Sequence, residues 1–299
     1  MKAKRFFQGT GTAIVTPFKK DGALDENALR RLVQFQLKGG VEALVPCGTT
    51  GESPTLTHDE QRRVAEIVLE EAHGKARVFA GAGGNNTQEV IEKARTAKRL
   101  GVNAILSVAP YFSKPTQEGF YQHFHAIAER ADVDIIVYNI PSRTGSNIEA
   151  GTMLRMAEEI PHLVGVKEAS GNLGQMMEIA HHRPLHFSLL SGDDVFTFPL
   201  IALGGDGVIS TTANQVPRLF SDMTRACLKG EWNKALELHY RLFHLMNANF
   251  IETNPIPVKA GLAMMGMIEE VYRLPLVPIS ANAREKLRKA MKELKLIAE

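Results

Sequence analysis

The sequence predicts an α/β fold, a (β/α)8 TIM barrel with a C-terminal helical extension. Eight short apolar or β-branched segments lie between residues 12 and 210, and each is followed by a longer segment with helical periodicity. Successive apolar segments lie roughly 20–35 residues apart, the length of one strand–helix–strand step. An open doubly wound sheet usually carries a glycine-rich phosphate turn after its first strand, and Thr16-Pro17-Phe18-Lys19 is not such a turn.

The predicted strands are apolar on both faces and do not alternate with polar residues, as expected of buried parallel strands. We place them at residues 12–16, 43–46, 77–80, 104–108, 135–138, 164–167, 188–191 and 208–210. Between the first two, a helix begins at Asp25-Glu26-Asn27 and ends at Gly39-Gly40. A second helix begins at a capping box, in which Thr57 is followed three residues later by Glu60.

After Ser210 the strand signals stop and only helices are predicted, at residues 217–229, 231–249, 257–267 and 281–296. The first of these closes the barrel. We therefore assign residues 1–230 to the barrel, which carries the active site, and residues 231–299 to the helical extension.

The composition excludes several classes of protein. The 35 basic residues against 33 acidic ones leave a net charge of 35 − 33 = +2 with charges of both signs interspersed, so we expect no nucleic-acid partner. No apolar run approaches the roughly 18 residues of a membrane span, and the N-terminus lacks the apolar core of a secretory signal. Cys47 and Cys227 form no disulfide or metal pattern, so we expect a cytoplasmic protein with two reduced thiols and no metal.

The carboxyl ends of the strands of such a barrel face one site, and Lys167 ends the sixth predicted strand. A lysine amine there has little water around it, which lowers its pKa and favours the neutral form that attacks carbonyl groups. Two alternatives remain open, a side chain that extends to the surface and an ion pair with Glu168.

Two further strand ends offer polar groups. Thr49 and Thr50 lie between glycines in a turn, where hydroxyls and backbone N–H groups can receive a carboxylate or start a proton relay, although an ordinary polar turn also fits. Tyr138 is either a core tyrosine or a proton carrier near the lysine. Arg143 is either a solvated loop residue or a clamp for a carboxylate.

Four motifs together resemble the dihydrodipicolinate synthase family, within the pyruvate-dependent Schiff-base lyases that include N-acetylneuraminate lyase. They are Gly48-Thr49-Thr50-Gly51-Glu52, the segment from Tyr138 to Gly145, Val166-Lys167-Glu168-Ala169, and Asn254-Pro255-Ile256-Pro257-Val258-Lys259. The resemblance covers essentially the whole chain, and Ser142-Arg143-Thr144-Gly145 is typical of the synthases themselves.

The resemblance implies that Lys167 forms a Schiff base with pyruvate without any cofactor, and that the enamine attacks L-aspartate 4-semialdehyde to give 4-hydroxy-tetrahydrodipicolinate, in lysine and diaminopimelate biosynthesis. Tyr138 is then the proton donor and acceptor, Thr50 its relay partner, and Thr49 a ligand of the carboxylate. Arg143 holds the semialdehyde carboxylate, while Gly192 and Ile209 line the pyruvate pocket through backbone groups.

One position departs from the family pattern. The relay of the family is completed by a second tyrosine from a neighbouring subunit, and the corresponding segment here reads Pro110-Tyr111-Phe112, with Phe112 at the tyrosine position. A phenyl ring passes no proton. Either a water molecule or Tyr111 takes the place of the missing hydroxyl, or turnover is impaired. Another aldolase or lyase of the superfamily, acting on 4-hydroxy-2-oxoglutarate or a 2-keto-3-deoxy sugar acid, is a further alternative, as is a non-catalytic protein that binds a 2-oxo acid.

Two further properties follow from the resemblance. It implies a homotetramer built as a dimer of dimers, while the charge pattern and the short apolar runs predict no membrane partner. Lysine-inhibited synthases resemble the chain at five positions, whereas Gln61 and Pro54 depart from their pattern. The matching positions, an expected inhibitor site, are Ser53, His58, Asn85, Glu89 and Tyr111.

Overall fold

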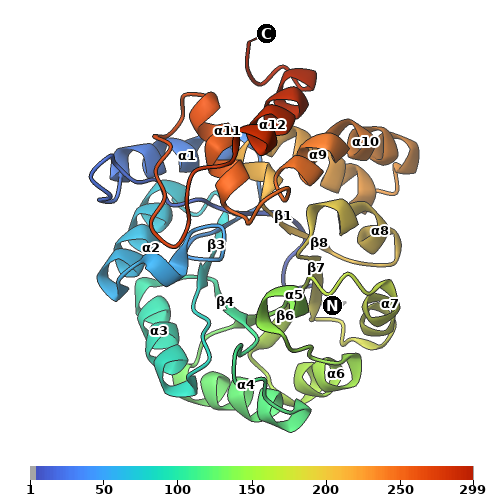
Figure 1. Cartoon of the computed structure of the whole chain (residues 1–299). Helices are drawn as coiled ribbons and strands as arrows, with labels where there is room; N and C mark the ends of the chain where they lie inside the picture. Colours follow the sequence, from blue (N-terminus) through green and yellow to red (C-terminus); the bar gives the residue numbers. More distant parts are fainter. Residues whose placement is uncertain (1–4, 299) are drawn as a thin grey trace. The chain divides into compact units, whose positions relative to one another are not determined.

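A computed structural model describes residues 5–298 and contains eight parallel strands that follow one another in chain order in a closed barrel (Figure 1). The predicted fold class is confirmed. The strands are β1 (Gly9–Ala13), β2 (Ala43–Val45), β3 (Arg77–Gly81), β4 (Ala104–Val108), β5 (Ile135–Asn139), β6 (Leu163–Glu168), β7 (Ser188–Ser191) and β8 (Gly207–Ser210). Every residue of β5 and β6 is buried, which explains why these strands are apolar on both faces.

The first strand lies further toward the N-terminus than predicted. Residues 12–16 were expected to form it, but β1 ends at Ala13, which pairs with Val45 of β2. The N–H group of Val15 donates to the side chain of Asn214 at 3.1 Å instead of extending the ladder. The apolar and β-branched residues continue to Thr16, although the pairing with β2 ends earlier and Asn214 becomes the hydrogen-bond partner of Val15. The prediction placed the strand too late because it followed these residues.

One compact unit consists of residues 5–9 and Phe79–Ile209. Its successive helices α3, α4, α6 and α7 pack side by side in the green part of Figure 1. The short α5 follows β5 directly and positions the loop after that strand. The helices of this unit are α3 (Thr87–Leu100), α4 (Gln117–Ala131), α5 (Pro141–Thr144), α6 (Ala150–Glu159), α7 (Leu173–His182) and α8 (Thr197–Ala202), with the 3₁₀ turn η2 (Asp194–Phe196).

The other compact unit consists of Thr10–Val78 and residues 210–298. Here α12 packs on α10 and α11, and α9 packs on α1, so that helices from the first and the last quarter of the chain share one unit (Figure 1). Its helices are α1 (Glu26–Gly39), α2 (His58–Ala72), α9 (Pro217–Leu228), α10 (Trp232–Ala248), α11 (Ile256–Met264) and α12 (Ala281–Glu293), with the 3₁₀ turns η1 (Ser53–Thr55) and η3 (Thr212–Asn214). The four helices predicted after Ser210 are therefore present, with ends that differ by up to three residues.

The predicted helix boundaries have a clear local cause. The carboxylate of Asp25 accepts from the N–H group of Ala28 at 2.9 Å, and Gly40 ends α1 with a positive φ of 78°. Thr57 and Glu60 form the predicted capping box reciprocally, at 3.2 and 2.9 Å. The division at residue 230 stays a prediction. Among residues 5–298, no helix combines the length and apolar character needed to span a membrane.

Candidate active site

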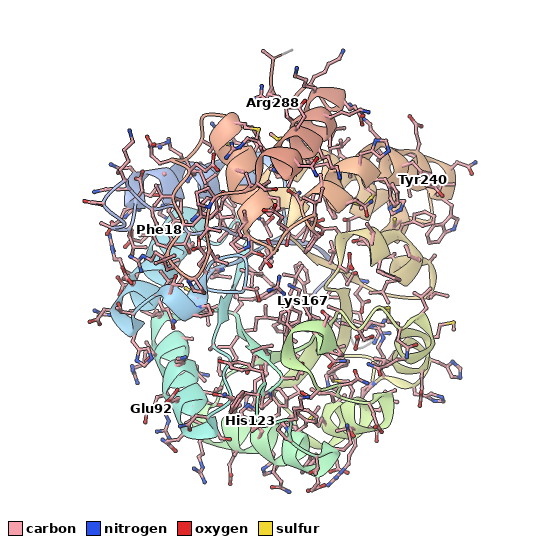
Figure 2. The ribbon with its side chains drawn as sticks, in the orientation of Figure 1. Phe18, Glu92, His123, Lys167, Tyr240 and Arg288 are labelled. Atoms are coloured by element: carbon pink, nitrogen blue, oxygen red, sulfur yellow. The ribbon has the colours of Figure 1, made fainter. Side chains whose placement is uncertain are left out.

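Lys167 lies on β6 between Tyr138 of β5 and Leu190 of β7. Only 5% of Lys167 is exposed, and its Nζ lies 4.2 Å from the centre of the Tyr138 ring. In the described part of the chain Lys167 makes no ion pair. Figure 2 shows this side chain close to α5. The lysine is thus a buried amine that faces an aromatic ring, and it does not extend to the surface.

Glu168 does not neutralise Lys167, because its carboxylate has other partners. This fully buried group accepts from the N–H group of Ser170 at 2.7 Å and from the amides of Asn139 and Gln175 at 3.1 Å each. Alternation along the strand directs successive side chains to opposite faces of the sheet. The lysine amine therefore remains available for chemistry.

Burial lowers the pKa of Lys167 from 10.5 to about 8. Nearby charges act in both directions, since Asp194 and Asp193 raise this pKa and Arg143 lowers it. With a pKa of about 8, about a tenth of the amine is neutral at pH 7, against less than about a thousandth for an ordinary lysine. The site thus prepares an amine nucleophile at neutral pH.

The segment after β7 packs directly against this lysine. A side chain at Gly192 would place its Cβ 3.1 Å from Cγ and Cε of Lys167 and 2.7 Å from the Cβ of Ala169, so only glycine fits. Asp193 and Asp194 follow, and burial together with Asp194 raises the pKa of Asp193. We did not select these two aspartates from the sequence, although their position directly after a strand was a usable signal.

Arg143 and Ile209 lie in the same compact unit. Arg143 is exposed on α5, which begins at Pro141 and ends at Gly145 in the left-handed conformation. Its charge acts on Lys167, so a guanidinium stands near the amine. Ile209 is buried on β8, the neighbour of β7. This unit therefore brings together the predicted residues Lys167, Tyr138, Arg143, Gly192 and Ile209.

The second unit holds the threonine turn that follows β2. Thr50 is 2% exposed, and its hydroxyl accepts from the amide of Asn254 at 2.9 Å and lies 3.3 Å from the hydroxyl of Thr211. Thr49 is partly exposed, and its hydroxyl makes no hydrogen bond within residues 5–298. The two hydroxyls thus differ, because Thr50 is already held and Thr49 is not.

Comparison with known proteins identifies the family. Residues 6–294 match the model of the dihydrodipicolinate synthetase family. The chain belongs to this family. It is 52% identical over 294 residues to the 4-hydroxy-tetrahydrodipicolinate synthase of Chloroherpeton thalassium, a match that covers 98% of this chain and 97% of that protein.

Solved structures of dihydrodipicolinate synthases show the same fold. The enzyme from Thermotoga maritima has a TM-score of 0.96 and 45% identity, with 98% of this chain and 100% of that chain covered. The chloride-inhibited enzyme from Acinetobacter baumannii, complexed with pyruvate, has a TM-score of 0.95 and 41% identity, with 97% and 99% covered. The resemblance noted in the sequence is therefore confirmed at the level of the family.

The segment that departs from the pattern of the dihydrodipicolinate synthetase family lies at the surface. Phe112 is 90% exposed with a φ of 68°, and Tyr111 is 41% exposed. The carbonyl of Tyr111 accepts from the amide of Asn85 at 3.4 Å. A phenyl ring so exposed contributes nothing to packing within its own chain.

The residues of the expected inhibitor site fall into both units. Asn85, Glu89 and Tyr111 belong to the unit of Lys167, where Glu89 lies in the first turn of α3. Ser53 lies in η1 and His58 begins α2, both in the other unit, and the carbonyl of Ser53 accepts from Gln61 at 3.0 Å.

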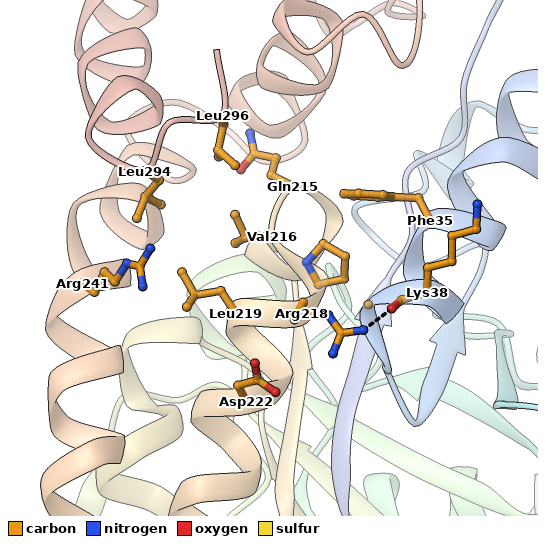
Figure 3. A pocket seen from close by; sticks show the side chains of 12 residues that line it. Phe35, Lys38, Gln215, Val216, Arg218, Leu219, Asp222, Arg241, Leu294 and Leu296 are labelled. Carbon is orange, nitrogen blue, oxygen red and sulfur yellow. Dashed lines mark hydrogen bonds between the residues drawn. The ribbon is translucent and has the colours of Figure 1, made fainter. Parts of the chain in front are cut away.

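A separate groove of about 610 Å³ contains none of the predicted residues (Figure 3). It lies between α1, α9, α10 and the segment after α12, and Arg218 donates to the carbonyl of Lys38 at its edge, at 2.6 Å. For residues 5–298 we find no group of three His, Cys, Asp or Glu side chains placed to hold a metal ion.

Proposed function

We propose that the protein is a 4-hydroxy-tetrahydrodipicolinate synthase that condenses pyruvate with L-aspartate 4-semialdehyde through a Schiff base on Lys167. The observation that carries this proposal is the buried Lys167 amine without an ion pair, 4.2 Å from the Tyr138 ring, with its pKa lowered to about 8. The relatives that carry this enzyme name, at about half sequence identity over the full length, support it.

In the first half of the reaction, the neutral amine of Lys167 attacks the keto carbon of pyruvate. A C–N bond forms, and the keto oxygen leaves as water after it has taken up protons, which gives an imine. The methyl group of the bound pyruvate then loses a proton to give the enamine. We assign these proton transfers to Tyr138, which adjoins the amine.

In the second half, the enamine carbon attacks the aldehyde, and the new alkoxide takes up a proton. The amino group of the condensed substrate then replaces the Lys167 amine at the imine carbon, which closes the ring and frees the lysine. Arg143 holds the carboxylate of the semialdehyde with its planar guanidinium. Gly192 and Ile209 line the pyruvate pocket through backbone groups.

The threonine turn supplies the proton relay and a receptor for the pyruvate carboxylate. From the sequence we assign the relay to Thr50 and the carboxylate to Thr49. The Thr50 oxygen accepts from Asn254, which still leaves its O–H as a donor for a relay, whereas the Thr49 hydroxyl is unengaged within residues 5–298. A comparison of Thr49→Val with Thr50→Val tests the two roles. Loss of the relay residue lowers kcat, whereas loss of the carboxylate ligand raises the KM for pyruvate.

The test of the proposed function is borohydride trapping of pyruvate followed by turnover with the semialdehyde. We expect a reduced pyruvate adduct on Lys167 and formation of the cyclic product. A folded protein that gives no adduct rejects every Schiff-base function for this chain. An adduct without product from the semialdehyde rejects the synthase alone.

Phe112 favours a second candidate, another aldolase of the superfamily that acts on 4-hydroxy-2-oxoglutarate or a 2-keto-3-deoxy sugar acid. Phe112→Tyr separates the two, because restoring a relay hydroxyl raises synthase turnover by roughly 10²-fold or more. If the parent protein is a slow synthase and Phe112→Tyr has the same turnover, the missing hydroxyl is not the cause of the slow turnover. Faster cleavage of the sugar acids than condensation of the semialdehyde establishes the aldolase.

We propose a homotetramer, a dimer of dimers that acts in the cytoplasm. Exposed apolar side chains recur at helical spacing along α10, with Leu236 39%, Tyr240 65% and Phe243 38% exposed. A stripe of this kind marks a protein interface, and the 90% exposed Phe112 offers a second contact. Sedimentation of the Tyr240→Glu variant beside the parent protein tests the first contact.

We also propose that lysine inhibits this enzyme through Ser53, His58, Asn85, Glu89 and Tyr111. The carboxylate of Glu89 is suited to an ammonium group and the amide of Asn85 to a carboxylate. A lysine titration of the initial rate with the parent protein and with Glu89→Gln tests this, and equal rates at every lysine concentration in the parent protein reject it.

A further inference from the structure

A second buried lysine lies in the C-terminal extension, where Lys259 of α11 forms an ion pair with Glu52. Both side chains are fully buried. Nζ of Lys259 lies 4.4 Å from the centre of the Phe18 ring and 5.3 Å from that of Tyr272. The N–H group of Arg273 donates to the second carboxylate oxygen of Glu52 at 3.4 Å.

A buried ion pair of this kind contributes little net free energy to the stability of a core. Removing two charges from water costs more than their attraction commonly returns, and well-packed apolar residues stabilise equally well or better. Glu52 also adopts the left-handed conformation, with φ 53° and ψ 36°, which is energetically unfavourable for residues other than glycine. What the pair achieves is the fixed placement of the backbone at Glu52.

Glu52 ends the turn that carries the two threonines, and each of the last three residues of this turn is held from outside. The Thr50 hydroxyl accepts from Asn254 at 2.9 Å, and the Gly51 carbonyl accepts from the Thr16 hydroxyl at 2.7 Å. Lys259 holds Glu52. Two of the three contacts come from the extension, from Asn254 and Lys259, so this part of the chain sets the conformation of the turn.

We propose that Lys259 and Glu52 form a positioning pair that keeps the threonine hydroxyls in the orientation used for proton transfer to the substrate. The inference rests on the proposed function. Lys259 acts through Glu52 and the turn and does not touch the substrate. The helical extension therefore contributes to catalysis by positioning the threonine turn.

The test replaces the pair by neutral side chains of similar size, in Glu52→Gln combined with Lys259→Met. The matched control is Arg183→Met combined with Asp206→Asn, which removes another buried pair, with side chains 1% and 4% exposed, from the residues that precede β7 and β8. Both variants are measured for melting temperature, kcat, KM for pyruvate, and borohydride trapping on Lys167.

We expect the Glu52/Lys259 variant to lose roughly 10- to 100-fold in kcat, as a small misplacement of a reacting group does, with trapping at the parent level. The control keeps the parent kcat. A folded Glu52/Lys259 variant with parent kcat overturns the proposal. So does an equal loss of kcat in the control, or a loss of trapping in proportion to kcat, because either result shows general damage to the fold.

A second variant tests the same proposal if the double variant does not fold. Glu52→Asp retains the charge but shortens the side chain by one methylene group, so the turn shifts while the pair persists. We expect a smaller loss of kcat with normal trapping, and a folded Glu52→Asp protein with parent kcat overturns the proposal. Absence of turnover and adduct in the parent protein refutes the proposed function itself, independently of these variants.

Discussion

Lys167 and Lys259 are both buried lysines, yet their surroundings give them opposite properties. Burial lowers the pKa of each amine. Lys259 has a carboxylate partner in Glu52 and lies between two aromatic rings. Lys167 has one ring beside it and no ion pair within residues 5–298. Burial by itself does not make a lysine a nucleophile, and the missing carboxylate partner distinguishes the proposed nucleophile, Lys167, from Lys259.

The charges around the two amines explain the difference further. Burial lowers the pKa of Lys167 to about 8, while Asp194 and Asp193 raise it from a distance and Arg143 lowers it further. At Lys259 the attraction comes from direct contact with Glu52. The contact with Glu52 therefore opposes the effect of burial directly at Lys259, whereas at Lys167 only charges at a distance oppose it.

The largest effect is expected from removing the proposed nucleophile. Lys167→Met loses roughly 10⁴-fold or more in turnover, the scale seen when a covalent nucleophile is lost, and gives no pyruvate adduct after borohydride. Lys259→Met serves as the comparison and still forms the adduct on Lys167 in its folded fraction. Peptide mass mapping checks both, and an adduct on Lys259 or any other lysine in Lys167→Met would break the distinction between the two sites.

Stability is expected to change in opposite directions in the same two variants. Lys259→Met leaves the Glu52 carboxylate buried without a cation and destabilises by about 3–5 kcal/mol. Lys167→Met stabilises at pH 7 by up to about 3 kcal/mol, because the native state with its pKa of about 8 binds the proton less well than the unfolded chain with 10.5.

The stabilisation expected from Lys167→Met depends on pH. A lowered lysine pKa costs stability in full below about pH 8, and the cost falls as the pH rises toward 10.5. Urea unfolding should therefore show that the advantage of Lys167→Met over the parent protein shrinks between these values. An advantage that does not change with pH contradicts the lowered pKa.

A moderate effect is expected from Arg143, the cation near Lys167. Arg143→Leu raises the KM for the semialdehyde by roughly 10- to 100-fold, the value of a charged hydrogen bond, and changes the KM for pyruvate little. Steady-state kinetics with both substrates measure this. An aldehyde without a carboxylate is the control, since the variant and the parent protein should handle it alike.

The smallest expected effect is on the pH profile of imine formation. The trapping rate should rise with pH with a midpoint near pH 8, where half of the Lys167 amine is neutral, and level off above that midpoint. Asp194→Asn removes a charge that raises this pKa and moves the midpoint down, whereas Arg143→Leu moves it up. Equal midpoints in the three proteins show that these charges do not act on the amine.

The strand pattern placed two residues of the Lys167 unit correctly. Lys167 and Tyr138 were placed at neighbouring strand ends, and they are direct partners in the β5–β6 ladder. This succeeded because a parallel barrel brings the carboxyl ends of successive strands together whatever the side chains do. The same logic reaches Asp193 and Asp194, which follow β7, but only their burial beside Lys167 shows that they act on its pKa.

The threonine turn of the other unit depends on contacts that no local pattern contains. Asn254 reaches Thr50 across 204 positions of the chain, and Lys259 reaches Glu52 across 207. The motif that contains both residues was recognised as part of the family resemblance, yet neither side chain could be assigned a partner. The first strand was misplaced for a similar reason, since the side chain of Asn214 ends it from 199 positions away.

The sequence by itself determined the barrel, the family and the candidate nucleophile, because strand spacing, apolar runs and strand-end residues are local properties of the chain. Only the tertiary structure decided which of two buried lysines is left without a carboxylate and which threonine hydroxyl is already engaged. Such questions depend on which groups meet after folding, and the free energy of a buried charge is set by its nearest partners.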